Sequence, residues 1–436
     1  MQESGFSSRT AMAVVVANMV GTGVFTSLGF QLLDIQSGFV LMMLWVVGGL
    51  TAMCGALCYA ELGAALPRSG GEYNFLTEIY HPVAGYISGW VSATIGFAAP
   101  TALAAITFGT YLGSAFPALS PMWLACGLVL ALTAVHASTR RSSGAVQRAF
   151  TVLKVLLIVG FCVLAWLLGN SQDVRFLPAA GDGSLIISSV FAVALIYVNY
   201  AYTGWNAATY LISELDDPER NLSRVLIFGT GTVMLLYLLL NFTFLHVAPM
   251  DAMAGKIEIG YVAAHHAFGA SGGDIMGTVL ALLLISTVSA MVMAGPRVLQ
   301  VIGQDFSAFR VLATTNRHGV PHVAIALQSS LTLLFIVTAS FESILVFAGF
   351  TLGLNTFFSV LGVFVLRWRR PDLPRPYRVA LFPLPPLIFL GFTGWTLTYI
   401  LLDRPQEGLM GLAIVASGAV CYFLTVWLGR RRAPAQ

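Results

Sequence analysis

The feature that most constrains the fold is a helix breaker inside the first long hydrophobic stretch of the chain. Gly21-Thr22-Gly23 lies near the middle of residues 10–32, where a membrane-spanning helix should be continuous. A second interruption, from Tyr202 to Asn206, falls near the middle of the sixth such stretch. Because lipid offers no hydrogen bonds, unwound backbone at membrane depth must face protein, a cavity or a ligand. A single glycine break can mean only close helix packing, but two breaks five spans apart indicate a binding site near the membrane midplane.

The composition places the chain in the lipid bilayer. Of its 436 residues, 57% are hydrophobic and only 9% are charged, whereas soluble domains carry about 25% charged residues. We therefore expect an all-α integral membrane protein with no nucleic-acid partner, no cofactor and no metal site. All five cysteines lie in apolar stretches, which argues against a disulfide framework. They are Cys54, Cys58, Cys126, Cys162 and Cys421.

Twelve apolar stretches are long enough to cross a bilayer, which takes about 20 residues of helix. They cover 10–32, 38–64, 82–113, 121–137, 145–169, 185–213, 222–248, 275–302, 322–339, 342–367, 381–402 and 408–429. The connections are short except for 249–274, where an amphipathic piece from Ile257 to Phe268 is expected to lie on the surface. We interpret its His265-His266 pair as solvated side chains rather than a metal site, and treat 1–436 as a single transmembrane domain.

Positive charge is distributed asymmetrically, which indicates the orientation. With the N-terminus in the cytoplasm, eighteen arginines fall on the cytoplasmic side and three basic residues fall outside. The inside set is Arg9, Arg68, Arg140, Arg141, Arg148, Arg220, Arg224, Arg297, Arg310, Arg317, Arg367, Arg369, Arg370, Arg375, Arg378, Arg430, Arg431 and Arg432. The outside set is Arg175, Lys256 and Arg404. We therefore predict both termini in the cytoplasm, and the short termini favour the inner (plasma) membrane of a prokaryote.

The order of the breaks predicts two related halves. Repeat one covers about 10–169 and repeat two about 185–367, each with five helices and each beginning with a glycine-interrupted span. Because five is odd, the second half enters the membrane from the opposite side, which makes an inverted repeat of the kind found in secondary transporters. Helices eleven and twelve, about 381–429, lie outside this 5+5 repeat.

The two breaks offer opposite partial charges. A half-helix that begins in mid-membrane presents unpaired N–H groups and partial positive charge, which suits a carboxylate. A half-helix that ends there presents free carbonyls, which suit an ammonium. An α-amino acid carries both groups on one carbon, and hydrogen bonds to its charges contribute about 1.5–3 kcal/mol each. The breaks therefore predict a site for a zwitterion.

Polar and aromatic side chains accompany both breaks. Thr22 can add a hydroxyl donor, or can bond back to its own helix. Tyr200, Tyr202 and Trp205 can close over a bound side chain as a gate, or can serve as core packing or an interfacial belt. Asn206 is polar at membrane depth and needs a partner from a helix, water or substrate.

Lys154 lies inside the fifth span, and an ionisable residue at that depth is a functional candidate by default. Its ammonium could hold the carbonyls freed by the first break, in place of a bound Na⁺, and it could also exchange a proton. The alternative is that the side chain extends to the cytoplasmic edge, since Arg148 is only six residues earlier.

Acidic residues are absent from the central parts of spans one, three, six, eight and ten. A site for cationic substrates should contain a carboxylate, so the pattern favours neutral ones. Glu61 and Glu214 lie near inner helix ends as gate or capping candidates. The seven histidines are mostly in loops or at helix ends and form no cluster with a nucleophile or metal-ligand pattern. An enzyme or a channel is therefore the less favoured class.

Several motifs, taken in order, resemble a known family. They are Val20-Gly21-Thr22-Gly23-Val24-Phe25, Glu61-Leu62-Gly63 with Pro67 to Tyr73, Tyr200 to Asn206, Glu214 to Asn221, and Arg370-Pro371-Asp372 with Arg375-Pro376-Tyr377. Through these motifs the chain resembles, over nearly its whole length, the L-type amino acid transporter branch of the amino acid–polyamine–organocation superfamily.

The resemblance implies Na⁺-independent transport of L-amino acids, often as one-for-one exchange by alternating access. It implies that Gly21, Thr22 and Gly23 hold the substrate carboxylate, that Tyr200 is the aromatic gate, and that Lys154 stands in for a sodium site. The candidate substrate site is Met19, Val20, Gly21, Thr22, Gly23, Tyr200, Tyr202, Thr203, Trp205 and Asn206. A proton-coupled symporter on the same fold is the alternative.

Three departures from the family pattern refine these expectations. Thr203 replaces a glycine found in several large-substrate members, which favours small neutral substrates such as alanine or serine. The helix-eight hydroxyl expected to meet Lys154 falls at Met291, so the nearby Ser286, Thr287 and Ser289 are the candidate partners. The segment 113–121 has no cysteine, so we expect no disulfide-linked accessory subunit.

Overall fold

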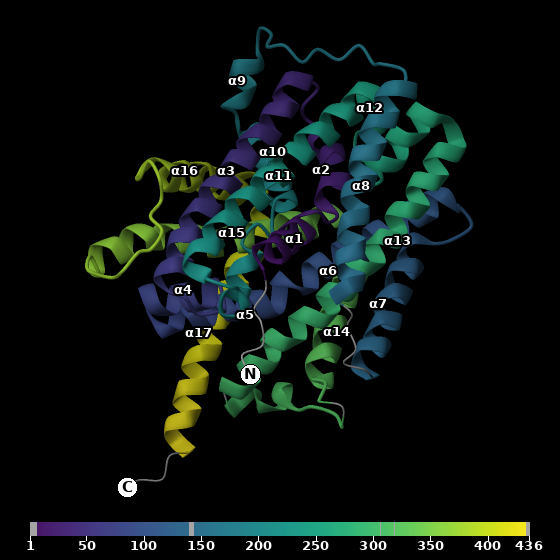
Figure 1. Cartoon of the computed structure of the whole chain (residues 1–436). Coiled ribbons are helices and arrows are strands. Elements are labelled where there is room, and N and C mark those ends of the chain that lie inside the picture. The colour runs from purple at the N-terminus through teal and green to yellow at the C-terminus, as the bar shows by residue number, and fades with distance from the viewer. Residues whose placement is uncertain (1–6, 139–143, 306, 318, 433–436) are drawn as a thin grey trace.

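The computed structural model describes residues 7–138, 144–305, 307–317 and 319–432, and this part of the chain is a bundle of helices (Figure 1). Its first half contains α1 (Ser8–Met19), α2 (Gly23–Gln31), α3 (Gly38–Ala65), α4 (Glu72–Ile79), α5 (Pro82–Val91), the π-helical turn η1 (Ser92–Gly96), α6 (Ala98–Ala115), α7 (Pro121–Ser138) and α8 (Gly144–Leu168). Its second half contains α9 (Asp182–Ile186), α10 (Ser189–Ala201), the 3₁₀ segment η2 (Ala207–Glu214), α11 (Pro218–Val247), α12 (Met250–Met253), α13 (Ile259–Asp305), the 3₁₀ segment η3 (Ser307–Ala313), α14 (His322–Thr338), α15 (Phe341–Arg369), α16 (Leu384–Asp403) and α17 (Pro405–Arg432).

The helices reproduce the predicted spans. Ten helical segments of the described chain are long and apolar enough to cross a membrane, and α10 and α14 are shorter apolar helices. The all-helical membrane fold and the interruptions of the first and sixth spans are confirmed. The inverted relation between the two halves stays a prediction.

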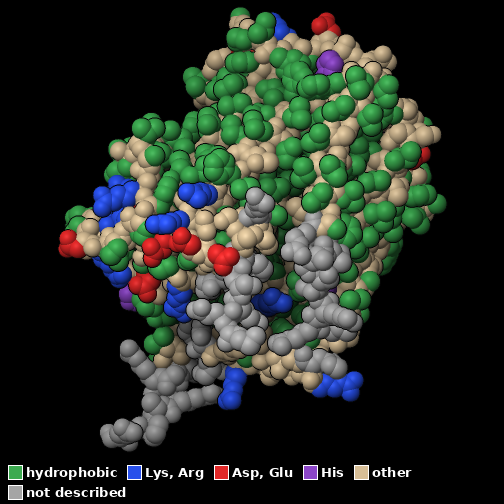
Figure 2. Space-filling view, in the orientation of Figure 1, with side chains coloured by type: hydrophobic (Ala, Val, Ile, Leu, Met, Phe, Trp, Pro, Cys, Tyr) green, Lys and Arg blue, Asp and Glu red, His purple; other side chains and the backbone are tan. Residues whose placement is uncertain are grey.

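Apolar side chains cover much of the outer surface, which suits a lipid environment (Figure 2). Leu167, Leu168 and Ile275 are 73%, 67% and 66% exposed. Most charged side chains in the same view lie toward the lower end of the bundle. Among the arginines that predict this end to be cytoplasmic, Arg140 and Arg141 lie outside the described residues.

The segment 249–274 has the expected amphipathic character, with His265 and His266 exposed on one face. Helix α13 already begins at Ile259, with a non-helical residue at Gly269, and the side chains of Ile259, Ala263 and Ala264 are fully buried. Small residues allow close helix contact, and the backbone N–H of Gly260 donates to the Tyr111 hydroxyl on α6 over 2.9 Å. One face of this segment is therefore packed into the bundle, and the opposite face lies on its surface.

Candidate functional site

The first break leaves backbone donors free at mid-bundle. Helix α1 ends at Met19 and α2 begins at Gly23. The N–H of Gly21 turns back to the carbonyl of Met19 over 2.7 Å. The N–H groups of Thr22, Gly23 and Val24 donate to no protein group within the described chain. This start of α2 has the free donors and the partial positive charge that suit a carboxylate.

Space is present in front of these donors. A methyl group added at Gly21 would meet only the Met19 carbonyl oxygen, at 3.9 Å. Neighbouring Asn18 is exposed although it lies beside the break. A small molecule therefore has room at Gly21 without displacing a side chain.

The second break lies directly against the first. Helix α10 ends at Ala201, and Gly204 turns the chain with φ of 98°, a left-handed conformation that favours glycine. A Cβ on Gly204 would lie 2.8 Å from the carbonyl carbon of Asn18, and one on Gly23 would lie 2.4 Å from the Cα of Ala201. Two of the glycines therefore allow the two backbones to touch.

Tyr237 bridges both breaks and was not among the residues predicted from sequence. Its hydroxyl, on α11, lies 2.5 Å from the carbonyl oxygen of Met19 and 3.1 Å from that of Ala201. The side chain is fully buried. One hydroxyl proton serves two carbonyls, so the contact can shift from one break to the other. A tyrosine in the middle of the seventh span was the only signal available in the sequence.

Lys154 contacts the first break. The ammonium on α8 donates to the carbonyl of Val20 over 3.3 Å and to the hydroxyl of Thr287 on α13 over 2.8 Å. Only 6% of the residue is exposed, so it does not extend to the bundle surface. Its positive charge satisfies a carbonyl that the interrupted helix leaves open.

Of the three candidate partners on helix eight, only Thr287 has a hydrogen bond to this amine in the described chain. Ser286 donates to the carbonyl of Leu283 in its own helix over 3.0 Å. Ser289 lies 2.8 Å from the Nε2 atom of His136 on α7. Each residue turns an α-helix by about 100°, so both side chains point at least about 100° away from the direction that Thr287 takes.

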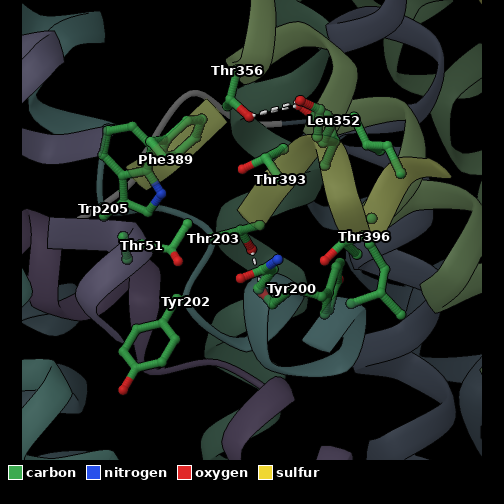
Figure 3. Close-up of a pocket in the computed structure, with 16 residues that line it drawn as sticks. Thr51, Tyr200, Tyr202, Thr203, Trp205, Leu352, Thr356, Phe389, Thr393 and Thr396 are labelled. Carbon is green, nitrogen blue, oxygen red and sulfur yellow. Dashed lines mark hydrogen bonds between the residues drawn. The ribbon is translucent and has the colours of Figure 1, made fainter. Parts of the chain in front are cut away.

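A cavity of about 60 Å³ lies beside the second break (Figure 3). Four of the predicted site residues line it, namely Tyr200, Tyr202, Thr203 and Trp205. Its other walls come from α3, α15 and α16 and were not predicted. These walls include Thr51, Leu352, Gly353, Thr356, Phe389, Thr393, Thr396 and Leu397. No side chain in the cavity wall carries a formal charge.

The remaining predicted residues have different neighbours. Asn206 donates to the carboxylate of Glu72 on α4 and lies outside the cavity wall. Glu72 is 3% exposed and also accepts hydrogen bonds from Tyr59 over 3.0 Å and from Tyr210 over 2.6 Å. The last residue of the second break, Asn206, is thus held in place by a buried carboxylate. Sequence reasoning found Asn206 but missed its partner.

The aromatic residues of the second break are packed as well as lining the cavity. The ring of Trp205 lies edge-on to Tyr59, with centroids 4.7 Å apart. The Tyr202 ring lies 5.0 Å from that of Tyr237. The Tyr200 ring has no such contact in the described chain. The hydroxyl of Thr203 donates to the Tyr200 carbonyl over 2.7 Å. The interpretation as a gate therefore fits Tyr200 better than it fits Tyr202 and Trp205, whose rings are packed against other rings.

Comparison with known proteins gives a consistent result over the whole chain. The family model for amino acid permeases matches residues 6–427. The large neutral amino acids transporter small subunit 2 of Mus musculus is 30% identical, covering 96% of this chain and 80% of the relative. The Asc-type amino acid transporter 1 of the same species is 28% identical, with the same coverage. The b(0,+)-type amino acid transporter 1 of Mus musculus is 27% identical, covering 96% of this chain and 87% of the relative.

The matched relatives are transporters and not enzymes, in agreement with the expectation from the histidines. With the interrupted helices in contact at mid-bundle, the comparisons establish that this chain belongs to the amino acid permease family and is an amino acid transporter of the multi-pass membrane type.

Proposed function

We propose that the protein exchanges small neutral L-amino acids across the membrane, without sodium, by alternating access. The observation that carries the proposal is the contact between the two breaks. The free N–H groups of Thr22, Gly23 and Val24 would bind the substrate carboxylate. The carbonyls of Tyr202 and Thr203, which accept no hydrogen bond in the described chain, would bind the ammonium.

Independence from sodium is supported by Lys154. Its ammonium donates to the carbonyl of Val20. It would therefore neutralise an oxygen that the interrupted helix exposes, which is the role that a bound Na⁺ would otherwise have. The hydroxyl of Thr287 completes its contacts. Replacing sodium with choline in the transport buffer should therefore leave uptake unchanged.

The size and charge of the substrate follow from the cavity. Thr203 adds a side chain where a glycine would leave more room, and the remaining space is about 60 Å³. One water occupies about 10–15 Å³ on this measure, so the space suits a few heavy atoms. Without a charged group in its wall, the cavity would leave a charged substrate side chain without a partner.

Reconstitution tests the proposal. Purified protein in liposomes should take up labelled L-alanine or L-serine, and unlabelled amino acid in the lumen should raise the rate. Equal uptake into empty liposomes would exclude obligatory exchange. A failure to take up any amino acid would exclude the main proposal.

Proton-coupled symport is the second candidate, and one observation favours it. Within the described chain, the partners of the buried Lys154 are a carbonyl and a hydroxyl, with no carboxylate. An amine without a counter-ion can give up its proton when conditions change. If this occurs during transport, an imposed pH gradient should drive net accumulation into liposomes that contain no amino acid.

We also propose a plasma-membrane location with both termini in the cytoplasm, and transport without a disulfide-linked subunit. The charge bias of the loops supports the orientation. Cys54, Cys58, Cys126 and Cys162 are buried, and Cys421 is partly buried. Migration of the native protein on a gel should be the same with and without reductant.

A further inference from the structure

Helix α16 brings two threonines to the far wall of the cavity, outside the predicted 5+5 repeat. Thr393 and Thr396 are 6% and 1% exposed, and Figure 3 shows both beside the space that Thr203 and Tyr200 line from the other side. The Thr396 hydroxyl has no hydrogen-bond partner in the described chain. A buried hydroxyl without a partner is unfavourable and needs an explanation.

Other threonines show that this arrangement is not the default. Threonine in a helix commonly bonds back to the carbonyl four residues earlier. Thr51 does so to Val47, and Thr398, also on α16, does so to Gly394, each over 2.8 Å. Thr396 makes no such bond. Its hydroxyl is therefore not committed to the backbone of its own helix.

The rest of the wall complements a short side chain. Leu352, Phe389 and Leu397 supply apolar surface. The polar side chains in the wall are Thr393 and Thr396 together with Thr51, Asn199, Tyr200, Tyr202, Thr203, Trp205 and Thr356. The volume of about 60 Å³ admits a few heavy atoms but no long or charged chain. Such a wall discriminates between side chains of equal size by whether they can form hydrogen bonds.

Building on the proposed function, we propose that Thr393 and Thr396 form a specificity subsite for short neutral side chains that end in a hydroxyl or amide. L-threonine should therefore be preferred over L-valine, which has the same shape but carries a methyl group in place of the hydroxyl. A bound hydroxyl would give Thr396 its missing partner, whereas a methyl group would leave it unpaired. One such hydrogen bond corresponds to about a three- to tenfold preference.

The test measures competition by L-threonine and by L-valine against labelled L-alanine uptake in liposomes. The wild-type protein should bind L-threonine about three- to tenfold more tightly. Thr396→Val, which removes the hydroxyl and retains the shape, should bring the two inhibition constants close to equal. Thr398→Val is the matched control, since Thr398 is exposed on the same helix, and should retain the wild-type ratio.

The possible results distinguish a failure of the subsite from a failure of the proposed function. Equal inhibition of the wild type by both amino acids, or an unchanged ratio in Thr396→Val with normal alanine uptake, would overturn the subsite. Should Thr396→Val fail to fold, Thr393→Val provides the same measurement, and Thr396→Ser should keep the preference. Absence of alanine uptake by the wild type would instead refute the proposed function itself.

Discussion

The two breaks in this protein touch, but they are held in different ways. The first is held through its carbonyls, by the ammonium of Lys154 on Val20 and the hydroxyl of Tyr237 on Met19, and its N–H groups remain free. The second is held by side chains, through Asn206 and the buried carboxylate of Glu72, and it faces a cavity. Under the proposed function, the first break would bind the substrate carboxylate, and the second would bind the ammonium and face the variable side chain.

The contact between the breaks can be removed by a single methyl group. In Gly23→Ala the added Cβ would lie 2.4 Å from the Cα of Ala201, a backbone atom that cannot move alone. Overpacking of this kind typically costs about 1–3 kcal/mol, and here it separates the two halves of the site. We expect liposome transport to be lost, with a lower melting temperature of the purified protein.

The control for this change is two residues away. Gly21→Ala adds the same methyl group where the nearest atom is 3.9 Å distant, and the protein should keep its wild-type melting temperature. Equal melting temperatures for the two variants would contradict the close approach of the breaks.

Removing the cation should weaken the first break without affecting the second. Lys154→Ala deletes a charged donor whose hydrogen bonds are worth about 1.5–3 kcal/mol, so uptake at low substrate should fall by about 10–150-fold. The relative inhibition by L-threonine and L-valine, which depends on the cavity, should remain as in the wild type. Lys256→Ala, at the other, exposed lysine, should behave like the wild type.

A change in that relative inhibition, measured with the residual uptake of Lys154→Ala, would show that the two breaks do not work separately. Uptake as fast as in the wild type would show that the ammonium is not needed at the first break.

The converse experiment perturbs the second break. Glu72→Ala removes the acceptor of Tyr59, Asn206 and Tyr210, and a buried donor left unpaired costs about 1–3 kcal/mol. Uptake should fall by about 5–100-fold, and the ratio of inhibition constants for L-threonine and L-valine should change. Glu72→Gln, which retains one acceptor oxygen, should restore part of the activity.

Glu78→Ala is the matched control, because Glu78 lies on the same helix α4 but its side chain is 41% exposed in its ion pair with Arg370. Exposed ion pairs of this kind contribute little. An equal loss in both variants would mean that α4 needs its acidic residues for reasons unrelated to the break.

The sequence predicts the twelve spans and both breaks because hydropathy and glycine report directly on the membrane and on backbone freedom. Lys154 is identified because charge at membrane depth is rare. Its exact partner is not, because choosing Thr287 over Ser286 or Ser289 requires the rotation of α13 to within about 100°.

The missed residues share a different cause. Helices in a membrane have apolar side chains toward both lipid and protein, so hydrophobic periodicity does not show which face is inside. The cavity wall formed by Thr393 and Thr396 could not be distinguished from lipid-facing sequence. The amphipathic pattern from Ile257 to Phe268 predicts an exposed face, but it does not show how closely Gly260, Ala263 and Ala264 pack on the other face, because they pack by being small.

Tyr237 provides the finest test of the comparison because its hydroxyl contacts a carbonyl at each break. Tyr237→Phe removes one hydroxyl from between the carbonyls of Met19 and Ala201, at a cost of about 0.5–1.5 kcal/mol. Uptake should fall by about two- to tenfold. If its hydroxyl passes from one break to the other during transport, the maximal rate should fall more than the apparent affinity. A loss confined to affinity would mean that Tyr237 only shapes the bound state. Tyr261→Phe, which removes a hydroxyl in an exposed contact with Asp274, should leave both quantities unchanged.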